Sequence, residues 1–210
     1  MLIVTGRSVA PIAAAGLVQL ARRFASTVVD LGTGDGRFVL ATAAARPDAL
    51  VVGVDANAAG MAEASRRAAR PPHRGGLANA RFIVAPAESL DEELPNFADE
   101  LHVHFPWGSL LRGLVAPDPD ALGRIARLTR HAGSVTLLLS VAEADRAMGL
   151  EPLDEAAVAL LATAYAAHGL ELAEARRATA ADLVAAHSSW GKRLDAGGRR
   201  RAWLVRLRRR

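Results

Sequence analysis

Short apolar runs alternate with helical segments along most of this chain, and this alternation limits its fold more than any other feature. Five runs are typical of strands, being rich in apolar or β-branched residues and bounded by Gly, Pro or Asp: Thr27–Asp30, Leu50–Asp55, Arg81–Val84, Glu100–His104 and Ser134–Leu139. Helical composition marks the segments Arg37–Arg46, Ala58–Arg70 and Asp120–Arg130. Such a series predicts an α/β fold, in which a parallel sheet is covered by helices on both faces.

The remainder of the chain completes one domain of ordinary size. We expect a helix over Asp154–His168 and two late strands over Leu170–Arg177 and Ala202–Arg208. The chain has 210 residues, of which 51% are hydrophobic, and this is enough to bury a core. It contains no internal repeat and no low-complexity linker, so a single domain is expected over residues 1–210.

The composition excludes several classes of protein. There is no cysteine, which excludes disulfides, thiolate catalysis and cysteine-ligated metals. No run of 18 or more apolar residues lacks a charge, so no membrane-spanning helix is expected. The opening sequence MLIVTGRSVAPIAAAG lacks the basic start of a signal peptide. We therefore expect a cytoplasmic protein.

Positive charge is concentrated in two segments. The net charge of +4 comes from 26 basic and 22 acidic residues. Nine basic residues and one acid give +8 to the segment from Lys192 to Arg210, and five arginines give +5 between Arg66 and Arg81. The rest of the chain carries −9. An acidic body with two basic segments indicates a polyanionic partner, nucleic acid first, and the plain alternative is a solvated tail.

The strongest local motif is Asp30-Leu31-Gly32-Thr33-Gly34-Asp35-Gly36, which follows the first expected strand. Its glycines allow a tight turn and a close approach of the backbone to a ligand. It is not the dinucleotide fingerprint, which needs glycine where Arg37 stands, and no Gly-Lys-Ser/Thr follows as in a P-loop. The Asp30 carboxylate would repel a pyrophosphate and would suit a cationic or amino-bearing ligand.

Two further acids follow the next two strands. Asp55 ends the second strand, where its carboxylate could accept hydrogen bonds from both hydroxyls of a ribose, and Glu88 follows the third strand. Parallel strands present their carboxyl ends to one crevice, so these acids are expected to line it. The arrangement resembles the S-adenosylmethionine pocket of class I methyltransferases over Thr27 to Glu88. The alternative is a plain strand-to-helix turn.

A third motif, His102-Val103-His104-Phe105-Pro106-Trp107-Gly108-Ser109, ends the fourth strand. His102 and His104 fall on one face, but no third ligand is signalled nearby, so we expect packed or hydrogen-bonded histidines and no metal. Phe105-Pro106-Trp107 resembles the Asn-Pro-Pro-Tyr loop of exocyclic-amine methyltransferases. It lacks the first Asn, which disfavours amine methylation, and keeps an aromatic ring on which a base can stack.

The three tryptophans stand in different contexts. Trp203 lies in the apolar sequence Ala-Trp-Leu-Val and is expected in the core. Trp107 and Trp190 each stand beside Gly and Ser outside a regular strand. Core packing is the ordinary interpretation of either one alone. As a pair they suggest a two-sided stacking clamp for a planar base.

These motifs together resemble one family. Pro106-Trp107-Gly108-Ser109-Leu110-Leu111-Arg112-Gly113, Ser188-Ser189-Trp190 and the Asp30–Gly36 loop are similar to the Kam-type aminoglycoside-resistance methyltransferases, the 16S ribosomal RNA (adenine-1408 N1) enzymes. The resemblance covers nearly the whole chain. It implies a class I, Rossmann-like, doubly wound and mostly parallel seven-stranded sheet with an antiparallel last strand. A short hairpin over about residues 1–10 and a basic segment over about residues 188–210 complete the implied domain.

The resemblance also implies roles for individual residues. S-Adenosylmethionine, with S-adenosylhomocysteine as product, would be held by Asp30, Gly32, Gly34, Asp55, Ala87, Glu88, His104 and Ser109. Trp107 and Trp190 would sandwich the flipped adenine, and Ser188 would help to hold the loop near the cofactor. Phosphates of 16S rRNA in the 30S subunit would be bound by Arg66, Arg67, Arg70, Arg74, Lys192, Arg193, Arg199, Arg200 and Arg201. The implied enzyme is a monomer.

The implied chemistry needs no acid–base pair. Adenine N1 carries a free lone pair at neutral pH, so no proton has to be removed before attack, and positioning and desolvation remain as the enzyme's task. The methylated base is a cation, which two indole faces would stabilise.

One departure and three alternatives accompany this interpretation. The segment Val141–Leu153 is short and acidic beside the long linker expected in the resistance enzymes, which keeps open a weakly active or inactive ribosome-binding homologue. The transfer-RNA guanine-N7 methyltransferases have a comparable Phe-Pro-Trp element, although Trp190 argues against them. A small-molecule methyltransferase would not need the two basic segments.

Overall fold

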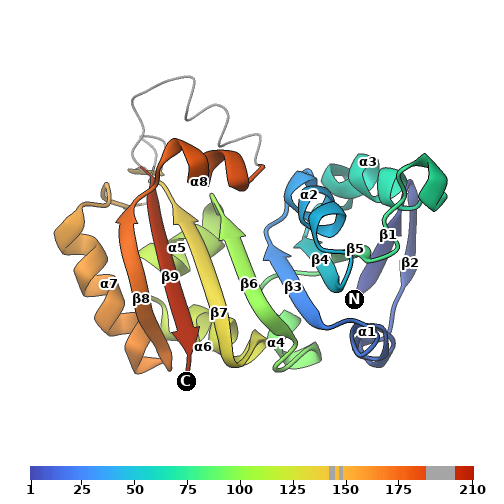
Figure 1. The fold of residues 1–210 in the computed structure, drawn as a ribbon. Helices are drawn as coiled ribbons and strands as arrows, with labels where there is room; N and C mark the ends of the chain where they lie inside the picture. The colour runs from blue at the N-terminus through green and yellow to red at the C-terminus, as the bar shows by residue number, and fades with distance from the viewer. Residues whose placement is uncertain (142–144, 147–148, 188–201) are drawn as a thin grey trace.

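A nine-stranded sheet in the order β2-β1-β5-β4-β3-β6-β7-β9-β8 forms the centre of the molecule (Figure 1). The computed structural model describes residues 1–141, 145–146, 149–187 and 202–210. Neighbouring strands from β5 to β7 are parallel, whereas β9 runs antiparallel to both β7 and β8. The predicted doubly wound, mostly parallel sheet with an antiparallel last strand is confirmed.

The elements of the described chain follow the alternation seen in the sequence. The strands are β1 (Leu2–Thr5), β2 (Ser8–Pro11), β3 (Ser26–Leu31), β4 (Ala49–Asp55), β5 (Ala80–Val84), β6 (Ala98–His104), β7 (Thr129–Leu139), β8 (Leu170–Arg177) and β9 (Trp203–Arg209). The helices are α1 (Ala14–Ala21), α2 (Arg37–Ala45), α3 (Ala58–Ala68), α4 (Leu90–Glu93), α5 (Gly108–Val115), α6 (Pro119–Leu128), α7 (Glu155–Ala167) and α8 (Ala180–Ala185), with a short 3₁₀ turn, η1, over Pro72–Arg74.

The sheet has two strands more than the seven implied by the family resemblance, because the N-terminal hairpin joins it. β1 pairs antiparallel with β5, with Leu2 opposite Val84, and β2 pairs with β1. Without the hairpin, β5 would expose a row of unpaired backbone groups at the edge of the sheet. The hairpin itself was expected from the sequence, and its pairing with β5 was not.

Helices α1, α4, α5 and α8 were not expected, and one expected helix ends early. The segment Asp120–Arg130 has helical composition throughout, but α6 ends at Leu128. Thr129 already belongs to β7, where it pairs with Ala98, while its hydroxyl donates to the Ile125 carbonyl at 2.8 Å. Strand pairing at this position overrides local helical preference.

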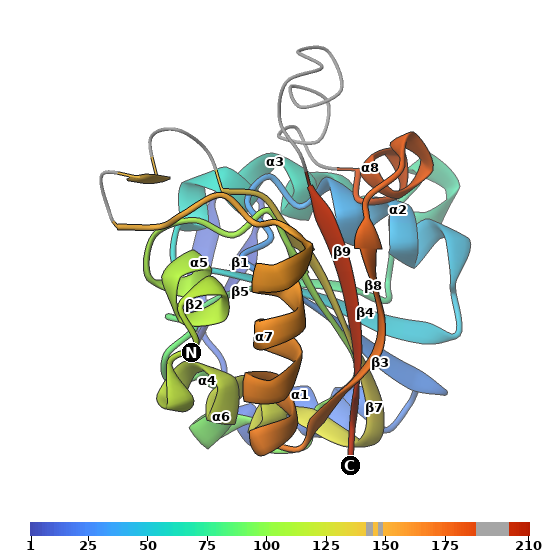
Figure 2. The same cartoon turned by 90° about the vertical axis from the view of Figure 1, so that its left-hand side faces the viewer.

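Helices cover both faces of the sheet, and each face has its own apolar core. On one face α1, α5, α6 and α7 contribute residues such as Leu17, Leu114, Leu122 and Tyr165. On the other face α2 and α3 pack Val39 and Met61 with their neighbours. Figure 2 shows α5, α6 and α7 along one side of the strands. Among the described residues, no helix is both long and apolar enough to cross a bilayer.

The side chain of Asn79 fastens α2 to the start of β4. This residue is buried, and its Nδ2 lies 3.0 Å from the Ala43 carbonyl and 2.9 Å from the carbonyls of Arg46 and Ala49. Replacing Asn79 with alanine leaves these buried acceptors without their donor, and is expected to lower the free energy of unfolding by about 1–3 kcal/mol. Replacement with aspartate should be worse, because its carboxylate is an acceptor facing acceptors. Thermal and urea unfolding of the two variants would test this; an unchanged midpoint for both would contradict it.

Candidate functional site

A cleft opens where β3, β4, β5 and β6 end, and it consists of two adjoining cavities. One cavity of about 280 Å³ is lined by residues that include Ala85, Ala87, Glu88 and Ser109. The other, of about 170 Å³, is lined by residues that include Asp30, Gly34, His104 and His187. Both cavities share three lining residues, Gly32, Asp55 and Trp107. All eight residues expected to hold the cofactor therefore line this cleft.

The glycine loop forms the floor between β3 and α2. Gly32, Gly34 and Gly36 have positive φ angles of 77°, 58° and 70°. At Gly36 a Cβ atom would lie 2.6 Å from a ring carbon of Phe82 and 2.8 Å from the Cβ of Ala64. Only glycine fits this turn, which brings α2 close to β5 and α3.

Asp55 is held with both carboxylate oxygens in fixed positions. Its Oδ2 accepts from the Gly34 N–H at 2.9 Å, and its Oδ1 accepts from the Asn57 N–H at 2.8 Å. Each oxygen keeps a further lone pair, because a carboxylate oxygen can accept two hydrogen bonds. The carboxylate is thus oriented at the cleft and able to accept from a diol such as a ribose.

Asp30 lies deeper in the cleft and is 2% exposed. Its Oδ2 accepts from the Thr33 hydroxyl at 2.6 Å, and its Oδ1 lies 3.5 Å from Nδ1 of His104. Burial raises the pKa of Asp30 from 3.8 to about 6, and the Thr33 hydrogen bond opposes part of this rise. Burial also lowers the pKa of His104 to about 3, so the imidazole is neutral at pH 7 and its contact with Asp30 is not an ion pair. A buried carboxylate without a cationic partner is suited to a positively charged ligand.

The raised pKa of Asp30 predicts that the affinity for S-adenosylmethionine depends on pH. The protonated carboxyl stabilises the fold below about pH 3.8, and this contribution is lost as the pH rises through about 6. A cationic ligand needs the ionised form, so its affinity should fall by about tenfold between pH 7 and pH 5. Calorimetric titration at both pH values would measure this. The Asp30→Asn variant should bind S-adenosylmethionine weakly, with an affinity that no longer changes between pH 7 and pH 5. If its affinity still changes as much as that of the wild type, the pH dependence belongs to another group.

Glu88 and Ser109 close the other end of the cleft. The Ser109 hydroxyl donates to Oε1 of Glu88 at 2.9 Å and so joins the loop after β5 to the first turn of α5. Ala87 lines the same cavity beside them. The predicted grouping of these three residues is therefore present.

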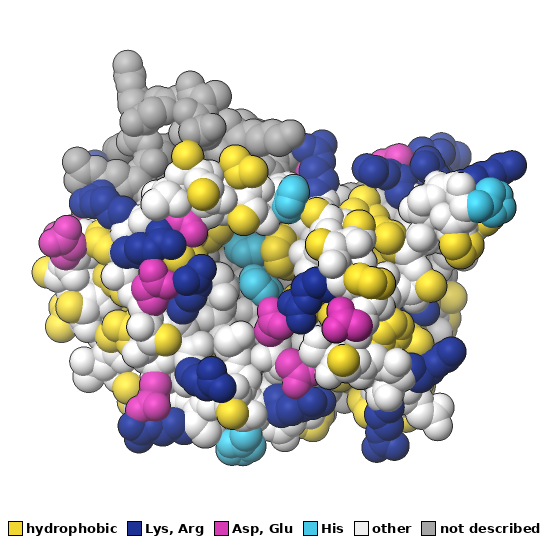
Figure 3. Space-filling view, in the orientation of Figure 1, with side chains coloured by type: hydrophobic (Ala, Val, Ile, Leu, Met, Phe, Trp, Pro, Cys, Tyr) yellow, Lys and Arg dark blue, Asp and Glu magenta, His cyan; other side chains and the backbone are white. Residues whose placement is uncertain are grey.

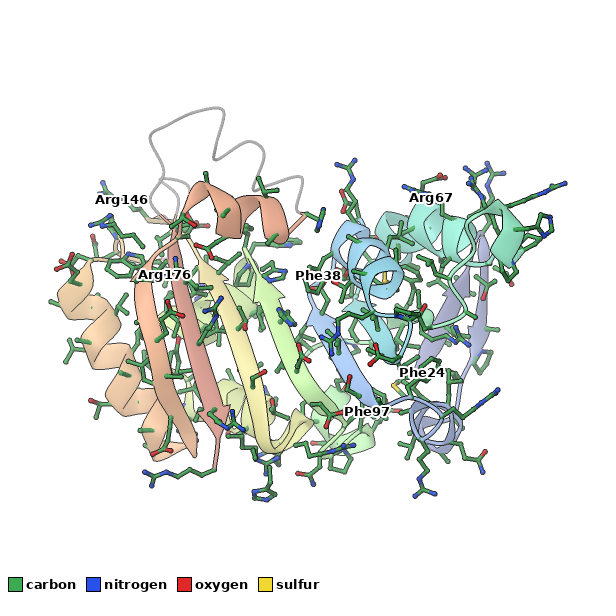
Figure 4. All side chains as sticks on the ribbon, in the orientation of Figure 1. Phe24, Phe38, Arg67, Phe97, Arg146 and Arg176 are labelled. Carbon is green, nitrogen blue, oxygen red and sulfur yellow. The ribbon has the colours of Figure 1, made fainter. Side chains whose placement is uncertain are left out.

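His102 and His104 pack against an aromatic side chain. The ring of Phe38 lies 4.8 Å from that of His102 and 4.6 Å from that of His104, between α2 and β6 (Figure 4). Within the described chain, no three His, Cys, Asp or Glu side chains are grouped as for a metal ion. Nδ1 of His104 is buried, lacks a hydrogen-bond partner among the described residues and belongs to a side chain that lines the cleft. The nitrogen lies 3.5 Å from Oδ1 of Asp30, so the imidazole borders the carboxylate at the base of the cleft.

Trp107 stands exposed at the mouth of the cleft. Its side chain is 81% exposed, although tryptophan is large and apolar. Phe105, two residues earlier, is buried with a positive φ of 50°. A non-glycine residue in this region stores strain of about 1–3 kcal/mol, and such strain is common at functional sites. The sharp turn lets Phe105 pack inward and leaves the indole of Trp107 outside.

Helix α8 brings the other wall of the cleft to Trp107. Arg176 on β8 donates from Nη1 and Nη2 to the two carboxylate oxygens of Asp182 on α8, at 2.6 and 3.0 Å. Thr179 completes a capping box with Asp182. The helix is thereby fixed above the sheet, where Figure 4 places Arg176 beneath it, and the chain reaches the cleft at Ala186 and His187. Sequence reasoning missed this network, because its members have ordinary surface composition. Ser188 comes directly after His187 and Trp190 two residues later; both lie outside the described residues.

Four of the residues expected to bind phosphates lie in the described part of the chain. Arg66, Arg67, Arg70 and Arg74 are exposed on the end of α3 and the loop that follows. Arg81, counted with them in the +5 segment, is partly buried and donates to the carbonyls of Ala78 and Ala80 at 3.0 and 2.7 Å. It is therefore not part of that exposed surface. Lys192, Arg193, Arg199, Arg200 and Arg201 lie outside the described residues.

The end of the +8 segment also differs from a solvated tail. Arg206, Arg208 and Arg209 lie on β9, which runs away from the cleft because it is antiparallel to its neighbours. Arg206 pairs with Glu174 at 2.5 Å, Arg209 bonds to Asn96, and Arg210 pairs with Glu171. Arg206, Arg209 and Arg210 therefore each contact a neighbouring part of the fold.

This fold and this cleft define a class of enzyme. A doubly wound sheet with an antiparallel last strand, a glycine loop after the first strand of its parallel core and an acid after each of the next two are the features of a class I S-adenosylmethionine-dependent methyltransferase. The two cavities, the buried carboxylate of Asp30 and the oriented carboxylate of Asp55 fit a cationic nucleoside cofactor.

Comparison with known proteins identifies the family. The family model NpmA, described as 16S rRNA (adenine(1408)-N(1))-methyltransferase, matches residues 2–208, and the chain belongs to this family. A 16S rRNA (adenine(1408)-N(1))-methyltransferase of Streptoalloteichus tenebrarius is 34% identical over 200 residues, which cover 92% of this chain and 91% of the relative. The chain is thus an S-adenosylmethionine-dependent 16S rRNA adenine-N1 methyltransferase of an aminoglycoside-resistance family, and this supports the main interpretation over the transfer-RNA alternative.

Solved structures agree with this assignment. The 16S rRNA methyltransferase KamB superimposes with a TM-score of 0.88 at 32% identity, covering 100% of this chain and 99% of that one. A mutant 16S rRNA (adenine(1408)-N(1))-methyltransferase from Catenulisporales acidiphilia with cosubstrate SAM gives a TM-score of 0.88 at 28% identity, covering 100% of this chain and 96% of that one.

Proposed function

We propose that this enzyme acts as a cytoplasmic monomer on the assembled 30S subunit, and that Trp107 and Trp190 hold the flipped adenine between their indole rings. The single observation that supports the clamp is the exposure of Trp107, which is 81% solvent-accessible at the mouth of the cofactor cleft. His187, which lines the same cleft, precedes Ser188 and Trp190 by one and three residues in the sequence.

In this proposal each group of residues has one task. Asp30, Asp55, Glu88, His104 and Ser109, with the backbone of Gly32, Gly34 and Ala87, hold S-adenosylmethionine, which supplies an activated methyl group when it is bound. Trp107 holds the base in line by stacking. No side chain has to remove a proton, because N1 is already unprotonated at neutral pH. The indole face also stabilises the cationic product.

A methylation assay with four substrates tests this proposal. Purified enzyme and labelled S-adenosylmethionine are incubated with 30S subunits, with naked 16S rRNA, with transfer RNA, or without RNA, and reverse-transcription stops are mapped. We expect label and a stop at adenine 1408 with 30S subunits alone. Equal labelling of naked rRNA would overturn the requirement for the subunit, and binding without label would indicate the inactive homologue. Sedimentation of the active enzyme would test the monomer.

A further inference from the structure

The tip of the N-terminal hairpin is a tight turn that exposes one arginine. Thr5 and Ser8 are opposite one another in the pairing of β1 with β2, so Gly6 and Arg7 form a two-residue turn. Gly6 has a φ of 65°, which glycine adopts without strain and which hairpin turns of this length require. Arg7 is exposed at the outermost point of this turn.

This tip is fastened to α3 beside its basic residues. The Gly6 N–H donates to the hydroxyl of Ser65 at 2.8 Å, and that hydroxyl lies 3.4 Å from the Gly6 carbonyl. A Cβ atom placed on Gly6 would lie 3.7 Å from the Cβ of Arg66. The turn therefore holds Arg7 next to the end of α3, although some 60 residues separate them in the sequence.

Arg7 joins a surface of exposed arginines with almost no compensating acid. This surface, the hairpin–α3 surface, consists of Arg7, Arg66, Arg67, Arg70 and Arg74. Only Arg66 has an ion pair among the described residues, and its partner is Glu63. In Figure 3 the dark-blue side chains gather at the upper right, over α3 and the loop after it, and Figure 4 labels Arg67 there. Like charges gathered on one surface repel each other, so bringing these five arginines together does not in itself stabilise the fold.

Local structure explains some of these charges but not Arg7. Arg66 and Arg67 lie in the last turn of α3, where cations favourably oppose the helix dipole. Arg7 lies in the turn of a β-hairpin, where no helix dipole favours a positive charge. Covering the edge of β5 needs only the strands of the hairpin, and the turn could then carry any polar residue.

We propose that the N-terminal hairpin is part of the RNA-docking surface, and that Arg7 binds a backbone phosphate of rRNA beside the phosphates bound by Arg66, Arg67, Arg70 and Arg74. This inference rests on the proposed action on the 30S subunit. The hairpin tip and α3 lie on the same upper side of the molecule as α8 in both Figure 1 and Figure 2, so one RNA surface can contact all three. Phosphate recognition here depends on charge and carries no information on base sequence.

The salt dependence of subunit binding tests the inference. Dissociation constants for 30S subunits are measured at several KCl concentrations for the wild type, Arg7→Ala, Arg7→Lys and Arg7→Glu. Loss of one phosphate contact should reduce the slope of log K against log salt by about 0.7–0.9, and Arg7→Glu should bind more weakly than Arg7→Ala. Arg7→Lys keeps the charge and should retain the wild-type slope. A wild-type slope in Arg7→Ala would overturn the inference.

Arg22 provides the matched control. It is an exposed arginine at the end of α1, which Figure 1 places at the lower end of the molecule, away from the hairpin tip. Arg22→Glu changes the net charge by the same amount as Arg7→Glu, so equal weakening by both variants would show a general charge effect and overturn the proposed contact. Unaltered S-adenosylmethionine binding by each variant would confirm an intact fold.

Two further outcomes separate this inference from the proposed function. If wild-type enzyme neither binds nor methylates 30S subunits, the proposed function fails, whatever Arg7 does. If methylation of subunits is intact and insensitive to Arg7→Glu at every salt concentration, only the hairpin inference fails. Vesicles of equal phosphatidylcholine and phosphatidylglycerol are included as a competing polyanion. Binding to them that depends on Arg7, with subunit binding unaffected, would assign the surface to membranes and overturn the inference.

Discussion

Replacing Trp107 with alanine is expected to abolish methylation of 30S subunits while leaving the affinity for S-adenosylmethionine within a few-fold of the wild type. The indole is 81% exposed, so its removal opens no cavity in the core and should not lower stability measurably. Stacking on an aromatic ring contributes about 1–3 kcal/mol per base, and misalignment of N1 adds to that loss. We expect kcat/KM to fall by at least about 100-fold. Single-turnover methylation and calorimetric cofactor titration would measure the two effects separately.

Two variants sharpen the test of Trp107. Trp107→Phe keeps an aromatic face and should recover much of the lost activity, whereas an aliphatic residue of similar size should not. Leu160→Ala removes another exposed apolar side chain, 74% accessible on α7, and should have wild-type activity. If Trp107→Ala loses cofactor binding as well, the residue supports the cleft structurally and the stacking role is wrong.

Replacing Asp55 with alanine is expected to weaken S-adenosylmethionine binding by about 100-fold or more. The change removes the acceptor proposed for the ribose hydroxyls and leaves the backbone N–H groups of Gly34 and Asn57 without their 2.9 and 2.8 Å partners. Hydrogen bonds to a charged group are worth about 1.5–3 kcal/mol each, so the loss of two from a ligand amounts to several kcal/mol. Calorimetry with S-adenosylmethionine and with S-adenosylhomocysteine would measure it, and both should weaken equally because both carry the ribose.

Asp35 is the matched control for Asp55. It lines the same cavity from the glycine loop after β3, but its carboxylate contacts only Arg37, at 3.3 Å, among the described residues. Asp35→Ala should therefore weaken cofactor binding only a few-fold. Similar losses in the two variants would indicate a general effect of negative charge on a cationic ligand and would argue against a specific ribose contact.

The local sequence was sufficient to predict those residues of the site that lie at the ends of strands. Asp30, Asp55 and Glu88 each come at or soon after the end of an apolar run, and parallel strands bring such residues to one edge. The hairpin's pairing with β5 and the network of Arg176 with Asp182 could not be predicted in this way. These contacts join residues of unremarkable composition that become neighbours only when the sheet and α8 assemble.

The distribution of charge was likewise predictable from the sequence only in part. Counting basic residues indicated a polyanionic partner, but the two basic segments that it defined also included Arg81, Arg206, Arg208, Arg209 and Arg210, which were given no role in phosphate binding. The fold buries Arg81 in part, directs β9 away from the cleft, and brings Arg7, which stood alone in the sequence, beside α3. Counting along the chain cannot show which arginines share a surface, because that depends on strand direction and on which side chains are buried.

The class of fold, the cofactor loop and the family follow from the amino-acid sequence, since periodicity, glycine spacing and motifs are properties of neighbouring residues. Which side chains a ligand can reach depends on the assembled structure. It buries Asp30 enough to raise its pKa to about 6, keeps His104 neutral, and exposes Trp107 through the strained turn at Phe105. Burial, pKa and exposure depend on what packs around a residue, and distant segments supply that packing.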